Sequence, residues 1–163
     1  MNIEYRSMTL IGTSAESRTI KGIAVPYNSS SQLLHDRARP YREEFRMGAF
    51  PHIGDNVALY LGHDHKSLPL ARTGSGTLRF SETPEGLMFE ADLPESRPDI
   101  LEAVTRGDIP AVSIGFTAIT DDWNHRAKSM PSTRIVTKAH LFELSLVANP
   151  AYPGATITKD SIQ

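Results

Sequence analysis

Short apolar segments with a two-residue period dominate the sequence, and they limit the fold to one built mainly from strands. In the clearest of them, residues 87–93, apolar side chains recur at every second position, as a half-buried strand requires. Pro84 and Gly86 precede it and favour a turn, which predicts an antiparallel hairpin with residues 77–81. Further strands are predicted over residues 19–25, 57–61, 112–120 and 134–147.

One segment has a convincing helical pattern. Ser96 is the predicted N-cap, Pro98 stands in the first turn and Gly107 ends the helix. Residues 29–42 are predicted to form a polar loop, and residues 121–132 a surface loop or the tip of a hairpin. The mixed charges of residues 37–46, including Glu43 and Glu44, favour a solvated segment. At least six strands with one helix predict a mainly β, α+β fold, an antiparallel barrel or sandwich with a helix packed on it.

The length predicts a single domain over residues 1–163, because a chain of 163 residues can bury a sizeable core. Residues 156–163 have little to bury and are expected to form a flexible tail. The 17 basic and 19 acidic residues give a net charge of −2, which argues against nucleic acid and favours protein partners. The longest nearly apolar run, residues 111–119, is too short to cross a membrane, and the N-terminus lacks a secretory signal, so we expect synthesis in the cytoplasm.

Polar residues in apolar strands are the first candidates for chemistry. The sequence has no cysteine, which excludes a thiol nucleophile. Ser113 and Glu143 each lie in an apolar strand, and His63 and His65 follow the strand 57–61. A serine, a histidine and a carboxylate from separate strands can form a nucleophile, a base and an orienting group. A chain with six histidines also offers such triples by chance. In this alternative interpretation Ser113 is a small residue that fills its strand, Glu143 faces water on an edge strand and His63 is exposed in a loop.

The two neighbouring histidines permit a second interpretation, because a His-x-His pair places both side chains on one face of an extended strand and can bind a metal. The histidines that could complete such a zinc site are His35, His52, His125 and His140. No HExxH motif and no dense carboxylate cluster accompanies them, so we expect neither a metal nor a cofactor.

Several blocks in a fixed order give the chain a family resemblance. They are RTIKGIAVPYNS, MGAF, GHDH with PLAR, SGTLRF, GLMFEADLP, RGDIPAVSIGF and LFELSLVANPAYPGA. In their order and spacing they resemble the prohead proteases of tailed phages, serine peptidases related in fold to the herpesvirus assembly protease. The resemblance covers nearly the whole chain and implies an antiparallel β-barrel with a few peripheral helices.

The resemblance also implies roles for single residues. The histidine of the family's H-D pair falls on His63, with His65 as a competing base, and the serine before its G-F pair falls on Ser113. The acidic residue before its L-S pair falls on Glu143. For the oxyanion we expect backbone N–H groups in the loop 149–155, Asn149 and Ala151 among them. Ser145, which shares the face of Glu143, is the alternative serine.

The family implies a function inside the assembling prohead, in the cytoplasm of the host. Expected substrates are scaffold segments, the N-terminal region of the major capsid protein and the protease itself. The herpesvirus relatives are activated by pairing, so a second copy of the chain is a further expected partner. The alternative is a non-catalytic β-barrel module of capsid assembly that has kept the fold as a binding surface.

Overall fold

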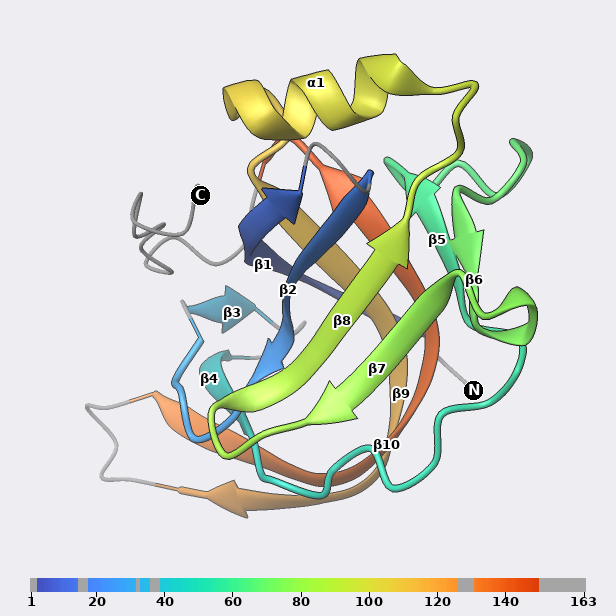
Figure 1. Cartoon of the computed structure of the whole chain (residues 1–163). Helices are drawn as coiled ribbons and strands as arrows, with labels where there is room; N and C mark the ends of the chain where they lie inside the picture. Colours follow the sequence, from blue (N-terminus) through green and yellow to red (C-terminus); the bar gives the residue numbers. More distant parts are fainter. Residues whose placement is uncertain (1–2, 15–17, 32, 36–38, 126–130, 150–163) are drawn as a thin grey trace.

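The computed structural model describes residues 3–14, 18–31, 33–35, 39–125 and 131–149, of which residues 7–14 are described by their backbone (Figure 1). In chain order the elements are β1 (Glu4–Ser14), β2 (Thr19–Pro26), β3 (Leu34–His35), β4 (Pro40–Phe45), β5 (Ala58–Leu61), β6 (Ala71–Arg72), η1 (Thr73–Ser75), β7 (Leu78–Glu82), β8 (Gly86–Asp92), α1 (Pro98–Arg106), β9 (Ala111–Asn124) and β10 (Ser132–Val147). The predicted strands are confirmed in β2, β5, β9 and β10, and the predicted hairpin is confirmed in β7 and β8.

A long antiparallel hairpin of β9 and β10 forms the centre of the sheet. β1 pairs with the other edge of β9 and, further along, with β2, from which the sheet continues to β8 and β7. The edge of β10 that faces away from β9 pairs in parallel with two short strands: with β4 near the start of β10 and with β5 near the end of β10. Among the described residues no strand pairing joins the two ends of this sheet. The mainly β class is therefore confirmed, and closure into a barrel stays a prediction.

The core lies between the apolar faces of the bent sheet. Figure 1 shows the β7–β8 hairpin opposite β9 and β10, with α1 across one end. Phe89 of β8, Phe116 of β9 and Leu144 of β10 are fully buried in this core. Burial of one such side chain stabilises the fold by about 1.5–3 kcal/mol, so these strands hold the site face in a fixed register.

The predicted helix is confirmed in α1, which packs Ile100 and Val104 into the core. It ends at Gly107, whose φ of 85° lies in the left-handed region that glycine adopts without strain. The prediction of Ser96 as N-cap is wrong, because Arg97 occupies that position and no side chain caps the helix. Pro98 sets the start instead, since its fixed φ suits the first helical turn.

The prediction of a polar loop over residues 29–42 is wrong in its second half. β3 and β4 lie there, and β4 pairs in parallel with the first residues of β10. This pairing turns the side chain of Glu43 inward, where it is 0% exposed rather than solvated. Arg6 Nε donates to its carboxylate at 2.7 Å and Arg134 Nη1 at 3.2 Å. Glu43 is buried because two arginines from distant strands compensate its charge.

Candidate active site

The polar residues of the site lie on the face of the β9–β10 hairpin that points away from the core. Ser113 stands directly opposite Ser145, and Gly115 stands directly opposite Glu143. Because side chains alternate along a strand, these four residues share one face. The predicted serine, Ser113, and the predicted carboxylate, Glu143, therefore lie on adjacent strands and in neighbouring cross-strand pairs of the same face.

The loop after β5 returns both predicted histidines to this face. Gly62 donates its N–H to the carbonyl of Leu146 at 2.8 Å, which ties the start of the loop to β10. Gly62 and His63 then both adopt left-handed backbone angles, with φ of 58° and 60°. For a residue other than glycine this conformation is uncommon and costs energy, and it is often found where function requires a side chain to point in one direction.

Asp64 keeps this loop in shape. Its N–H donates to the carbonyl of Leu61 at 3.1 Å, and its carboxylate accepts hydrogen bonds from the hydroxyl of Ser67 and the N–H of Lys66. These bonds, the one from Ser67 foremost, hold the pKa of the Asp64 carboxyl below its ordinary value. The residue between the two histidines is thus held by hydrogen bonds within its own loop.

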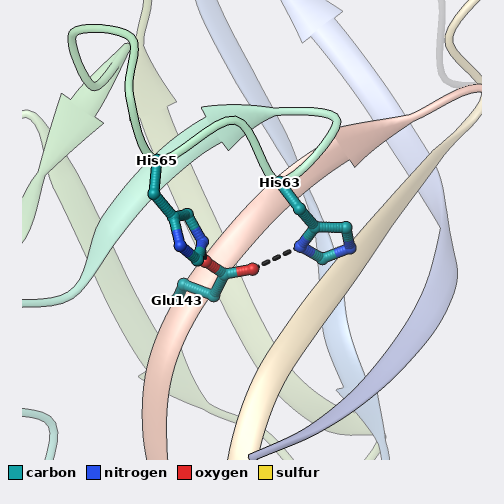
Figure 2. Close-up of side chains that lie close together, drawn as sticks. All are labelled: His63, His65 and Glu143. Atoms are coloured by element: carbon teal, nitrogen blue, oxygen red, sulfur yellow. Dashed lines mark hydrogen bonds and ion pairs between the residues drawn. The ribbon is translucent and has the colours of Figure 1, made fainter.

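Glu143 is contacted by both histidines at once (Figure 2). Nδ1 of His63 meets one carboxylate oxygen, and Nε2 of His65 meets the other. The Glu143 side chain is 6% exposed, so the histidines replace water as partners of a desolvated charge. Both candidate histidines are therefore partners of Glu143.

Ser145 fixes the position of His63. The backbone N–H of His63 donates to the Ser145 hydroxyl at 3.2 Å. The ring of Tyr5, from β1, packs edge-on against the imidazole with 4.6 Å between the ring centres. Residues directly opposite each other across two strands have Cβ atoms about 5 Å apart, so Ser113 lies next to the residue that holds His63.

Gly115 makes room for the carboxylate. A Cβ at this position would lie 2.7 Å from Cγ of Glu143 and 3.1 Å from Cε1 of Tyr5. Both separations are shorter than ordinary carbon contacts of about 3.5–4.0 Å. The absence of a side chain here lets Glu143 lie across β9, beneath the two imidazoles.

The two serines, Ser113 and Ser145, are the least accessible members of the group. Ser113 is 1% exposed and Ser145 is 0% exposed. A substrate carbonyl can therefore reach the Ser113 hydroxyl only if the segments around it separate. This burial is a property of the folded chain that the sequence does not reveal.

The remaining predicted residues lie apart from this cluster. Asn149 is exposed just beyond β10, and Ala151 and the predicted tail 156–163 fall outside the described residues. Within the described residues, the one group of three or more potential metal ligands consists of His63, His65 and Glu143, and none of the other four histidines belongs to it. The sequence does not point to the contact of Tyr5 with His63, because β1 reverses the usual pattern of burial. Its charged Arg6 is buried and the neighbouring aromatic Tyr5 is half-exposed.

A hollow of about 250 Å³ adjoins the cluster on the side away from Ser113. It is bordered by Glu143 and His65 together with the rings of Tyr5, Tyr60 and Phe142. Tyr5 and Glu143 both pair with Gly115, two residues along β9 from Ser113. Ile3, which also lines the hollow, lies two residues before Tyr5 and so further from Ser113. The hollow therefore gives solvent access to the Glu143 carboxylate from the side that faces away from Ser113.

A family profile described as caudovirus prohead serine protease matches residues 2–163. The chain belongs to this family. No curated protein and no solved structure shows significant similarity to it. Membership of this family supports a function as a serine peptidase of capsid maturation. The serine, the histidine and the carboxylate on one side of the β9–β10 hairpin are consistent with that function. Among the described residues, no helix is both long and apolar enough to span a membrane.

Proposed function

We propose that this prohead protease cuts peptide bonds with Ser113 as nucleophile, His63 as general base and Glu143 as orienting carboxylate. One observation carries the proposal: Glu143 contacts His63 through Nδ1. In a serine triad the acid binds Nδ1–H of the histidine, and Nε2 is the nitrogen that takes the serine proton. The contact at Nδ1 thus supports the tautomer in which Nε2 of His63 can accept a proton.

His65 fits the role of base less well. It contacts Glu143 through Nε2, the nitrogen that a triad histidine turns to the serine. Its side chain is also 51% exposed, against 31% for His63, and the backbone of His63 is the one bound beside Ser113 through Ser145. We therefore assign the base to His63.

The mechanism follows from these positions. The Ser113 oxygen attacks the peptide carbonyl carbon as its proton passes to Nε2 of His63. The positive charge that forms on the imidazole is stabilised by Glu143, whose low exposure strengthens the attraction. His63 gives the proton to the leaving amine, and water then releases the acyl group by the same steps. Backbone N–H groups that follow β10, from Asn149 onward, are our proposed oxyanion donors.

The substrates and the setting follow from the family. We propose that residues 1–163 form one protease domain whose sheet closes into a barrel, and that it acts inside the assembling prohead in the host cell. Its substrates would be scaffold segments, the N-terminal region of the major capsid protein and its own chain. A second copy of the chain is the proposed activating partner.

Labelling with a fluorophosphonate tests the assignment without knowledge of the cleavage sequence. Mass spectrometry should find the label on Ser113, and Ser113→Ala should abolish it. Ser145→Ala is the matched control, in which Ser113 should still be labelled, at a lower rate because His63 loses an anchor. Glu143→Gln should fold and lower the rate by about 10²–10⁴-fold.

Three outcomes would contradict the proposal. A label on Ser145 would transfer the nucleophile to β10. Loss of labelling in His65→Ala but not in His63→Ala would reverse the two histidines. A folded protein that neither reacts nor shortens itself would support the non-catalytic capsid-assembly module.

A further inference from the structure

Glu143 has one histidine more than a serine triad uses. His63 accounts for one carboxylate oxygen, and His65 contacts the other from the opposite side (Figure 2). The two ring nitrogens and the carboxylate oxygen that face one another all lie within 4.8 Å. Three potential metal-binding atoms from two separate segments thus converge on one point.

The kinds of atom in this group decide which ion would suit it. Two imidazole nitrogens and one carboxylate oxygen are the protein ligands of many zinc sites, where water takes the fourth position. Magnesium and calcium prefer oxygen ligands alone. The ion would also neutralise a carboxylate that is largely removed from solvent.

An ion has a route to this point. The hollow of about 250 Å³ is bordered by both His65 and Glu143, and His65 is half-exposed. Its volume exceeds that of one water molecule, about 30 Å³, several times, so a hydrated ion can enter and keep a water ligand. The ring of Tyr60 lies 5.0 Å from that of His65, centre to centre, and limits the movement of this imidazole.

We propose that His63, His65 and Glu143 form a zinc site that switches the protease off. The inhibition rests on the proposed function, whereas zinc binding itself does not. When zinc binds Nδ1 of neutral His63, the ring proton moves from Nδ1 to Nε2. Nε2 then has no lone pair for the proton of Ser113, and Glu143 is turned from the imidazole to the metal. Zinc binding and general-base catalysis are therefore mutually exclusive at His63.

Calorimetry on Ser113→Ala protein measures the site without any turnover. Titration with zinc chloride should show one ion per chain, and magnesium chloride should show no binding. Adding His65→Ala should weaken zinc binding by about 100-fold, since loss of even an outer-shell partner costs 10–100-fold in metal affinity. His140→Ala is the matched control, because this histidine is exposed, stands on β10 like Glu143 and lies outside the cluster. Its removal should leave the zinc affinity unchanged.

Two further measurements keep the proposal open to refutation if His65→Ala folds poorly. Cobalt chloride should give the strong visible absorption of a four-coordinate site, and His65→Gln should lose it. In wild-type protein, zinc should block labelling of Ser113 and a chelator should restore it.

Absence of binding, equal affinity in the His65 and His140 variants, or undiminished labelling in saturating zinc would overturn the inference. If the wild type is not labelled even in metal-free buffer, the proposed function fails while the calorimetric result still decides the zinc site.

Discussion

Gly115→Ala should weaken catalysis without touching any reacting group. The added Cβ would lie 2.7 Å from Cγ of Glu143, where carbon atoms normally keep about 3.5–4.0 Å. Glu143 must therefore withdraw by roughly 1 Å from its place beneath His63. A misplacement of this size commonly lowers a rate by about 10²-fold, and we expect that loss in the rate of fluorophosphonate labelling of Ser113.

The same change should cost little stability. Overpacking of this kind destabilises a fold by about 1–3 kcal/mol. The lower entropy of the unfolded chain offsets about 0.4–1 kcal/mol of that loss. The free energy of unfolding in urea should therefore fall by roughly 1–2 kcal/mol, and the variant should remain folded under the conditions of labelling.

Gly54→Ala is the matched control, since a Cβ at Gly54 would have no atom within 4 Å. It should be labelled at the wild-type rate and be as stable as the wild type or slightly more so. If Gly115→Ala is labelled as fast as Gly54→Ala with unchanged stability, the position of the carboxylate does not limit catalysis and our reasoning is refuted.

Three more predictions concern the fold and its regulation. Glu43→Gln removes the buried negative charge between Arg6 and Arg134, which keep their other partner Glu4, and should cost about 1.5–3 kcal/mol in urea unfolding. Glu44→Gln, which breaks a partly exposed pair, should cost at most about 1 kcal/mol, and equal losses would contradict this. Burial, followed by the hydrogen bond to the Glu82 carboxylate, raises the pKa of the Tyr27 hydroxyl. The stabilisation that the neutral Tyr27 hydroxyl gives the fold is therefore complete below about pH 10 and is lost as the pH rises further. Tyr27→Phe should flatten this alkaline fall in thermal unfolding experiments, and an unchanged fall would assign it elsewhere. Because Ser113 is 1% exposed, its labelling per chain should rise with protein concentration if pairing opens the site, and a rate that stays constant while sedimentation shows assembly would exclude activation by pairing.

Local patterns predicted most of the sheet correctly. β2, β8, β9 and β10 each alternate apolar and polar residues over part of their length, and turn residues separate β7 from β8. Such patterns act between neighbours in the chain, so they can be recognised without knowledge of distant contacts. The absence of cysteine likewise limits the nucleophile to another residue type through composition alone.

β1 and β4 escaped prediction because each buries a charged residue, Arg6 in β1 and Glu43 in β4. Glu43 is acceptable in the interior only beside Arg6, 37 residues away, and Arg134, 91 residues away. Without these partners the same segment would be solvated, as its composition indicates. The pairing of distant strands, and not the local sequence, decided that this carboxylate is buried.

The sequence by itself determined the residue types of the candidate site and the strands that carry or precede them. Strand alternation could not distinguish His63 from His65, because two residues i and i+2 on an extended chain point the same way, and in the sequence only the family's H-D pair favoured His63. Only the tertiary structure separates them: the left-handed turn at His63 presents Nδ1 to Glu143, while His65 presents Nε2. The register of β9 against β10 is equally decisive, since a slip by one residue would turn Glu143 into the core. These features depend on contacts between β5, β9 and β10, which form only when the whole sheet assembles.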